Sequence, residues 1–271
     1  MNTISSIFLG IVQGATEFLP ISSSGHLVLF QNLLGFKEPA LLLDSSLHLG
    51  TLLAICLYFR SDLKSMVRET LSFTIDLCHR RKSVTSIGEQ PYAFLTLWVA
   101  MGTLPTLVIG LVFRSFLENL FGSVTVVGIM LVFTGLILAI TRLIPKDYNT
   151  REKVGLFIAL TVGTAQGISL VPGISRSGAT IVCGMLCGLE RESAARFSFL
   201  ISIPAIMGAV VLQLTAEGLE KIELLPLISG FICSALVGLV ALKILMGMVR
   251  KGKLYYFAPY CWALGLIIVL V

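Results

Sequence analysis

Two segments of this chain repeat each other at a separation of 153 residues. Residues 10–25 read GIVQGATEFLPISSSG, residues 163–178 read GTAQGISLVPGISRSG, and the two align without a gap. The identical residues in the first copy are Gly10, Gln13, Gly14, Ile21, Ser22, Ser24 and Gly25, which correspond to Gly163, Gln166, Gly167, Ile174, Ser175, Ser177 and Gly178. An internal repeat predicts a fold built from two related halves, here about 1–150 and 151–271.

The two copies differ at the positions where a charge has the largest consequence. Glu17 in the first copy corresponds to Leu170 in the second, and Ser23 corresponds to Arg176. One copy therefore carries an acid and the other a base.

The composition places this repeat in a membrane. Hydrophobic residues make up 56% of the chain and charged residues only 13%, with a mean hydropathy of +0.93, which is too apolar for a soluble domain. Stretches of roughly 20 apolar residues, the length that crosses the hydrocarbon, occur at about 40–59, 92–113, 123–141, 197–214, 224–248 and 254–271. We expect an all-α polytopic membrane protein with six full transmembrane helices in a single membrane domain.

The repeated segments themselves do not read as full spans. Each has an apolar arm, a break rich in Pro, Gly and Ser, and a second short arm; the arms are 4–19 with 25–35 and 154–171 with 177–189. Broken helices are tolerated at membrane depth only where protein or water covers the loose backbone, so we interpret both as re-entrant helical hairpins. Three spans separate the hairpins, so they enter from opposite faces. This inverted-topology repeat predicts that the two tips meet near the midplane.

The distribution of Lys and Arg sets the expected orientation. Sixteen of the twenty fall on one face of the six-span arrangement, in the clusters 60–82, 142–153, 191–196 and 243–253. The other face has Lys37, Arg114 and Lys221. By the positive-inside bias the sixteen-charge face is cytoplasmic, so both termini and the entrance of the first hairpin lie outside. The net charge of +5 is then in part a topology signal, and no nucleic-acid motif accompanies it.

Three further features of the chain carry smaller expectations. Residues 1–9 have no charged side chain, so we interpret the N-terminal segment as part of the fold rather than a cleavable signal peptide. The six cysteines form no CxxC pair and are expected to be small core residues. Segment 60–91 is either an amphipathic surface helix or a solvated linker holding His79, and we favour the linker.

The hairpin tips hold the candidate functional groups. An ionisable residue at membrane depth is a functional hypothesis by default, and Glu17 and Arg176 are the two deepest charges. In the first tip Glu17 is followed by Ser22, Ser23, Ser24, Gly25 and His26; in the second, Ser175, Arg176, Ser177, Gly178 and Thr180 repeat the arrangement. Hydroxyls and free N–H groups at a helix start bind anions, and a guanidinium grips phosphate oxygens in two places. Two such tips facing each other suit a diphosphate.

A purely structural interpretation stands beside this one. Serines and glycines at helix breaks often cap helices or permit close packing, and Glu17 with Arg176 could form a structural buried ion pair. Gln13, one turn before Glu17, is expected to hydrogen-bond in support of the site, and His48, one turn from Asp44, has either a packing or a supporting role.

The motifs QGATEFLPISSSGH and PGISRSGAT resemble those of the undecaprenyl-diphosphatase family, the bacitracin-resistance phosphatases of bacterial envelopes. Its members carry an (E/Q)xxxE segment leading into SSxGH and later a PGxSRSxxT. The resemblance covers the whole chain in length and segment order. It implies hydrolysis of undecaprenyl diphosphate to undecaprenyl phosphate and inorganic phosphate in the bacterial inner membrane, which recycles the lipid carrier of cell-wall synthesis.

The resemblance also implies roles for individual residues. Glu17, Ser23, His26, Ser175, Arg176 and Thr180 occupy the family's site positions, with Ser22, Ser24, Gly25, Ser177 and Gly178 beside them. It implies a divalent cation, magnesium or calcium, with Glu17 as a ligand; some members have a glutamate where this chain has Gln13, which puts a two-carboxylate metal site in doubt. No organic cofactor is implied, and a homodimer is left open.

The residue types allow more than one mechanism and one competing function. We favour Ser23 as nucleophile with His26 or Glu17 as its base; attack by His26 or by a water held by Glu17 remains open. Inverted repeats with broken helices are also a transporter architecture, so a transporter or flippase of a lipid phosphate or anion is the alternative. A transporter does not need the Glu17, Ser23 and His26 set, and a structural scaffold would not need intramembrane Glu and Arg.

Overall fold

The computed structural model describes residues 2–36, 41–80, 83–121, 123–145, 148, 151–216 and 224–270. These residues form helices and connecting turns, with one isolated β-bridge between Arg151 and Leu189. The helices are, in chain order, α1 (Thr3–Phe18), α2 (Ser23–Leu33), α3 (Leu41–Tyr58), α4 (Arg60–Cys78), η1 (Val84–Glu89), α5 (Pro91–Val112), α6 (Arg114–Phe121), α7 (Val124–Ile140), α8 (Leu156–Ile168), α9 (Arg176–Leu186), α10 (Arg191–Ala216), α11 (Leu224–Arg250), η3 (Leu254–Phe257) and α12 (Ala258–Leu270).

The expected all-α class is confirmed, and the predicted apolar stretches coincide with helices. Among the described residues, α5, α10 and α11 are each long and apolar enough to cross a membrane, and a fourth span follows if the bent pair α3–α4 counts as one. The helices α7 and α8 and the segment Leu254–Leu270 are apolar but shorter. The structure therefore supports a polytopic membrane protein. Lys37, Arg81, Lys82, Lys146 and Lys221, used above to assign the faces, lie outside the described residues, as does the expected boundary at 150.

Both repeated segments form a helix, a short break and a second helix. The breaks separate α1 from α2 and α8 from α9. Ser22 and Ser175 are the N-cap residues of the second helices, where each hydroxyl accepts the backbone N–H three residues later, of Gly25 and of Gly178. A serine is favoured there because its oxygen satisfies an N–H group that has no partner within the helix. The conserved spacing of the repeat thus ends one helix and starts the next.

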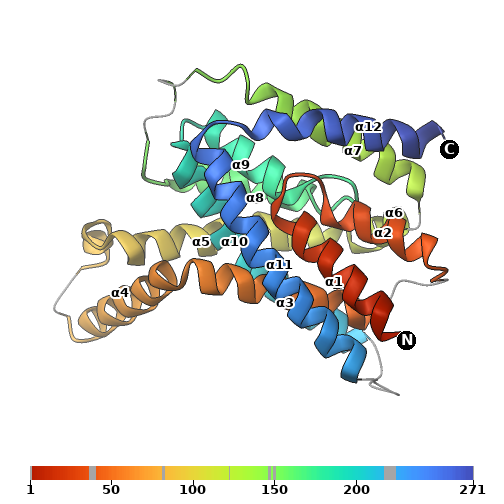
Figure 1. Ribbon diagram of the computed structural model, residues 1–271. Coiled ribbons are helices and arrows are strands. Elements are labelled where there is room, and N and C mark those ends of the chain that lie inside the picture. Colours follow the sequence, from red (N-terminus) through yellow and green to blue (C-terminus); the bar gives the residue numbers. More distant parts are fainter. Residues whose placement is uncertain are drawn as a thin grey trace.

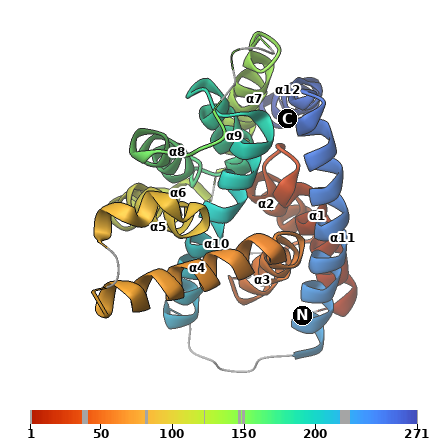
Figure 2. The same ribbon diagram turned by 90° about the vertical axis from the view of Figure 1, so that its left-hand side faces the viewer.

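Each hairpin packs against a helix from the other half of the chain. The first arm α1 lies along α11, and the equivalent arm α8 lies along α5. Glycines make both contacts close: a Cβ at Gly10 would lie 2.5 Å from the carbonyl oxygen of Gly230, and a Cβ at Gly163 would overlap the carbonyl of Gly102. Helix pairs of this kind approach closely because small residues line them, and Figure 2 shows α1 beside α11 and α8 beside α5. Here the glycines of the repeat have the packing role given above as the structural interpretation.

Segment 60–91 is mostly helical, so the preference for a solvated linker was wrong. The helix α4 follows α3 after a bend of 77° and packs against α5. Figure 1 shows α4 and the start of α5 projecting together from the other helices. The stretch 60–78 contains no Gly or Pro, and its buried residues Met66 and Phe73 lie two turns apart on one face. Val67 and Leu71 are exposed, and His79 is the C-cap residue.

The hydrophobic core surrounds the two hairpins. Its main cluster joins residues of α1, α3, α4, α8, α9, α10 and α11, with Phe18, Phe197 and Phe199 among the largest fully buried side chains. The cysteines contribute less to the core than expected. Cys261 is buried, and the half-buried Cys56, Cys183 and Cys187 pack against the main cluster. Cys233 is also half-buried, and Cys78 is exposed at the end of α4.

Candidate active site

Glu17 lies in the last turn of α1 and is almost completely buried. Gln13 lies one turn earlier on the same face and donates through Nε2 to Glu17 Oε2 at 3.0 Å. Ser23, the first residue of α2, donates its hydroxyl to the same oxygen at 2.5 Å. The expected supporting role of Gln13 agrees with this geometry, because the amide orients the carboxylate that the serine contacts.

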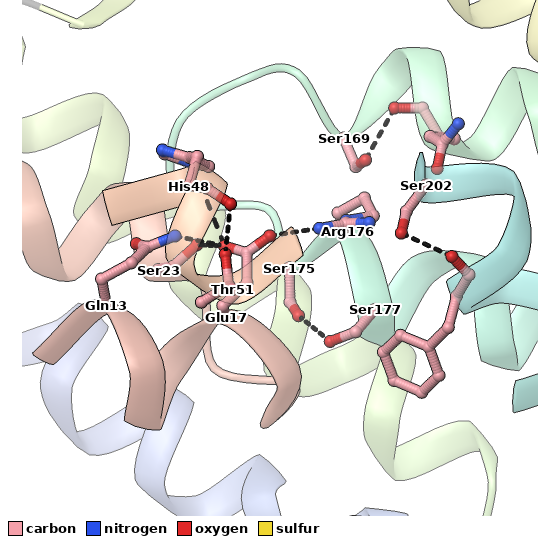
Figure 3. Close-up of polar contacts among 12 residues, drawn as sticks. Gln13, Glu17, Ser23, His48, Thr51, Ser169, Ser175, Arg176, Ser177 and Ser202 are labelled. Carbon is pink, nitrogen blue, oxygen red and sulfur yellow. Dashed lines mark hydrogen bonds and ion pairs between the residues drawn. The ribbon is translucent and has the colours of Figure 1, made fainter. Parts of the chain in front are cut away.

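Arg176 reaches the same carboxylate from the second hairpin. It is the first residue of α9, and its Nη2 donates to Glu17 Oε1. Figure 3 shows Glu17 between the side chains of the first hairpin and this guanidinium. The Arg176 side chain is 18% exposed and the Glu17 side chain 4%, so each charge is compensated mainly by the other rather than by water. The acidic residue of one copy, Glu17, is therefore in contact with the positively charged residue of the other, Arg176.

The hairpin tips lie against each other around this pair. A Cβ added to Gly178 would be 3.3 Å from Pro20 Cβ, and a Cβ added to Gly25 would be 3.5 Å from Gly173 Cα. Glycines at these positions let the backbones approach. The two breaks are thereby brought together as the repeat predicts.

The remaining serines of the tips form two matching pairs. Ser22 Oγ lies 3.3 Å from Ser24 Oγ, and Ser175 Oγ lies 3.2 Å from Ser177 Oγ. Since Ser22 and Ser175 also cap their helices, the hydroxyls have a structural role alongside the expected substrate contacts. Figure 3 shows the Ser175–Ser177 pair near Arg176.

The Thr180 hydroxyl makes its hydrogen bonds within α9 and with α10. It donates to the carbonyl of Arg176 at 2.7 Å and lies 2.5 Å from the hydroxyl of Ser198 on α10. These contacts hold the first turn of α9 against α10. The hydroxyl of Thr180 is thus engaged by the backbone of Arg176 and by Ser198, and its expected contact with substrate stays a prediction.

His26 is held by two partners, and neither is Glu17 or Ser23. Its Nδ1 lies 2.7 Å from the carbonyl oxygen of Ser22, and its Nε2 lies 2.7 Å from the hydroxyl of Tyr260 on α12. The role of Tyr260 was missed in the sequence. The available signal was a phenol within an apolar segment, where its hydroxyl needs a polar partner; Tyr260 as a whole is 46% exposed.

His48 is closer to the carboxylate than the sequence indicated. Its Nδ1 lies 2.7 Å from the backbone oxygen of Asp44, and its Nε2 lies 4.0 Å from Glu17 Oε2. The Asp44 carboxylate instead accepts from Gln31 on α2 at 2.6 Å. His48 therefore contributes a supporting contact to the site from α3, and Asp44 joins α3 to α2.

Three phenylalanines pack against one another, beginning at the residue after Glu17. Phe18, next to Glu17, packs edge-on against Phe199 at 5.7 Å between ring centroids, and Phe199 stacks on Phe59 at 6.0 Å. Beyond Phe59 lies a separate cavity of about 260 Å³, lined also by Tyr58, Asp62, Glu192, Arg196, Met246 and Arg250. Phe59 thus belongs both to this row of aromatic rings and to the lining of the cavity.

Comparison with known proteins identifies the family to which this geometry belongs. The family model described as bacitracin resistance protein BacA matches residues 6–267. The chain belongs to the bacitracin resistance protein BacA family. Proteins named undecaprenyl-diphosphatase are similar over almost the full length: one from Desulforapulum autotrophicum is 44% identical (98% of this chain, 97% of the relative), one from Desulfatibacillum aliphaticivorans 43% (98% and 97%) and one from Halothermothrix orenii 42% (100% and 98%).

The divalent cation that the BacA family resemblance implies is compatible with the oxygen atoms around Glu17. No group of three or more His, Cys, Asp or Glu residues suited to a metal occurs in the described part of the chain. The buried Gln13 Oε1 has no hydrogen-bond partner there, and it lies on the residue that contacts Glu17. Magnesium and calcium prefer oxygen ligands, and magnesium is commonly held by one or two carboxylates together with substrate phosphates. One carboxylate and one amide oxygen fit that pattern.

Proposed function

We propose that this protein hydrolyses undecaprenyl diphosphate to undecaprenyl phosphate and inorganic phosphate in the bacterial inner membrane. The observation that carries the proposal is the meeting of Glu17, Ser23 and Arg176 where the two hairpin tips touch. A hydroxyl, an acceptor for its proton and a phosphate-binding cation are the groups that phosphoryl transfer needs. The full-length similarity to proteins named undecaprenyl-diphosphatase supports the same substrate.

Ser23 is the proposed nucleophile and Glu17 its base. The Ser23 hydroxyl already donates to Glu17 Oε2, so the proton moves along an existing hydrogen bond as the oxygen attacks the terminal phosphorus. The bond from that phosphorus to the bridging oxygen breaks, and undecaprenyl phosphate leaves. Because both His26 ring nitrogens are engaged with Ser22 and Tyr260, Glu17 is better placed than His26 to accept the proton.

The second step returns the enzyme to its starting state. Glu17 first passes the proton taken from Ser23 to the departing undecaprenyl phosphate and is again a carboxylate. Water then attacks the phosphoserine and gives a proton to Glu17, which passes it to Ser23 Oγ as the bond from that oxygen to phosphorus breaks and inorganic phosphate departs. Arg176 balances the charge of the non-bridging oxygens in both steps, since a guanidinium has five N–H donors and the contact with Glu17 engages one nitrogen. The free N–H groups at the starts of α2 and α9 add to this charge balance.

Phosphate release by the purified protein tests this function. Wild-type protein in lipid nanodiscs with undecaprenyl diphosphate is expected to release one phosphate per lipid, and Ser23→Ala to lose more than about 99% of the rate while still binding the lipid. A transporter of the same lipid would bind it and release no phosphate. Ser23→Ala retaining more than about a tenth of the turnover, a change below roughly 1.4 kcal/mol, would exclude the serine nucleophile and favour an activated water.

We further propose that Glu17 and Gln13 Oε1 hold a divalent cation together with the diphosphate. The cation would neutralise phosphate charge when bound. Isothermal titration of magnesium and of calcium into wild-type protein and into Gln13→Leu protein tests the ligands directly. Equal affinities in the two proteins would contradict a role for Gln13.

The chain is proposed to form one membrane domain of two inverted repeats, with six spans and two re-entrant hairpins. Each hairpin packs on a helix of the other half, α1 on α11 and α8 on α5, which supports this arrangement. The two termini also lie on the same side of the molecule, opposite the far end of α4 (Figure 1). With native cysteines removed, Asn32→Cys is expected to react with an impermeant thiol reagent in intact cells and Lys251→Cys is not. The opposite labelling would overturn the outward-facing termini and site entrance.

A further inference from the structure

Tyr260 and His26 connect the last helix to the first hairpin. The Tyr260 hydroxyl and His26 Nε2 are 2.7 Å apart although the residues are separated by 234 positions, and the rings are almost parallel, with 7° between their planes. His26 is 4% exposed. A hydrogen bond between two ring systems from distant parts of the chain fixes the position of both.

The partners of His26 fix which nitrogen carries its proton. A carbonyl oxygen only accepts, so the 2.7 Å contact with Ser22 requires the hydrogen on Nδ1. Nε2 then carries the lone pair and accepts the Tyr260 hydroxyl. Tyr260 thus favours the neutral tautomer in which the imidazole donates to Ser22.

Ser22 needs such a contact because its backbone is strained. Its φ is 67° and its ψ 96°, in a region that residues other than glycine rarely adopt, whereas the equivalent Ser175 has φ −76° and ψ 115°. A conformation of this kind persists only when surrounding contacts hold it. The peptide that follows Ser22 leads directly into Ser23, whose hydroxyl contacts Glu17.

We propose that Tyr260 and His26 form a positioning pair, which holds the Ser22 peptide so that the Ser23 hydroxyl points at Glu17. The proposal rests on the phosphatase function above and assigns neither residue a contact with the reacting atoms. Its alternative is that His26 is itself the base or nucleophile, in which case Tyr260 would only orient a reacting imidazole.

Substitution of His26 separates the two roles. In His26→Asn the side-chain amide places a hydrogen-bond donor near the position of Nδ1 but has no basic or nucleophilic nitrogen. We expect His26→Asn to keep at least about a tenth of the wild-type kcat and His26→Ala to lose about a hundredfold or more. Equal and complete loss in both variants, with thermal stability like that of wild type, would overturn the positioning role.

A cycle with Ser22→Gly tests the link to the backbone, because glycine adopts positive φ without strain. Tyr260→Phe is expected to lower kcat about tenfold with KM changed less than twofold. In the Ser22→Gly background the same substitution should lower kcat less than about threefold, since the strained residue is gone. An equal effect in both backgrounds would show that Tyr260 does not act through Ser22. Tyr256→Phe is the matched control, because Tyr256 lies four residues away and is similarly exposed, at 54% against 46% for Tyr260.

A measurement without substrate separates this proposal from the phosphatase function. Nitrogen-15 NMR of the imidazoles, assigned by removing His26, His48 and His79 one at a time, is expected to show His26 neutral with its proton on Nδ1. A protonated ring or an Nε2–H tautomer would overturn the positioning pair whether or not phosphate is released. An inactive wild type with the expected tautomer would instead count against the function alone.

Discussion

Replacing Arg176 by lysine isolates the shape of the cation from its charge. The Arg176 guanidinium contacts Glu17 Oε1 in a mostly buried setting, where removing one partner of a pair costs about 3–5 kcal/mol of stability. Arg176→Lys keeps the positive charge beside Glu17, so we expect most of that stability to remain. A lysine has no planar fork, and its ammonium cannot hold two phosphate oxygens as a guanidinium does.

The expected loss is therefore in catalysis. Removing one well-placed donor from a developing charge costs about 2.7–4 kcal/mol, equivalent to roughly a hundredfold to a thousandfold in kcat. The assay is steady-state phosphate release from undecaprenyl diphosphate in nanodiscs, with thermal unfolding measured on the same preparations. The matched control is Arg196→Lys. Arg196 makes another arginine–carboxylate contact, with Nη2 2.5 Å from Asp62 Oδ1, and it lies outside the site. The kcat of this variant should stay within about threefold of wild type.

Two results would refute this reasoning. Near-normal turnover in a stable Arg176→Lys protein would show that only the charge matters and that the guanidinium grips no phosphate. A comparable loss in Arg176→Lys and Arg196→Lys would show that the assay reports general disturbance of ion pairs rather than binding at the hairpin tips.

Three further substitutions have expected outcomes. Glu17→Gln removes the proposed base and leaves Arg176 without its anion, so kcat should fall at least about a hundredfold and the melting temperature should also drop; a fall in neither would exclude Glu17 from the site. Gly163→Ala should lower the free energy of unfolding by about 1–3 kcal/mol, because its Cβ would overlap the Gly102 carbonyl. The control Gly247→Ala has open space at its Cβ and should change that free energy, measured by denaturant unfolding, by less than about 1 kcal/mol. Thr180→Val should cost about 1–3 kcal/mol of stability by removing the hydroxyl that contacts Arg176 and Ser198, with kcat lowered less than about tenfold; a larger kinetic loss at unchanged stability would place Thr180 in contact with substrate.

The sequence predicted helix positions well because breaks in this chain are marked locally. The Pro, Gly and Ser runs after Phe18 and Ile168 end one helix and cap the next, and both expected hairpins have boundaries within a few residues of those observed. Segment 60–78 was harder, because its charged residues suggested a solvated connection while its spacing of apolar residues favoured the helix that forms. In this segment the polar composition and the spacing of apolar residues favoured different structures, and the chain forms the helix that the spacing favoured.

Pairings between distant residues were predicted only where the repeat implied them. Glu17 and Arg176 could be brought together because they occupy equivalent hairpins. Tyr260 lies in no repeated motif, so nothing in the sequence connects it to His26. Identity also did not imply the same environment: Gln13 contacts Glu17, whereas its counterpart Gln166 contacts Thr106 and the carbonyl of Ile201. In both settings the amide nitrogen is the donor, and its two N–H groups reach different acceptors.

The exchanged packing of the two hairpins has a consequence for how the protein is made. The partner of α1 is α11, and 220 residues separate Gly10 from Gly230. At about 5–20 residues per second, the ribosome needs roughly 10–45 seconds to synthesise that interval, during which the glycines of α1 lack the helix that packs on them. Arg176, which is 159 residues from Glu17, is synthesised earlier in the same interval. The first hairpin must therefore remain in the membrane without its partner helix α11, and its glycine face must contact lipid, insertion machinery or other helices until α11 is inserted. Chains that terminate before α11 lack the helix on which α1 packs, and they should be degraded rather than accumulate in the membrane.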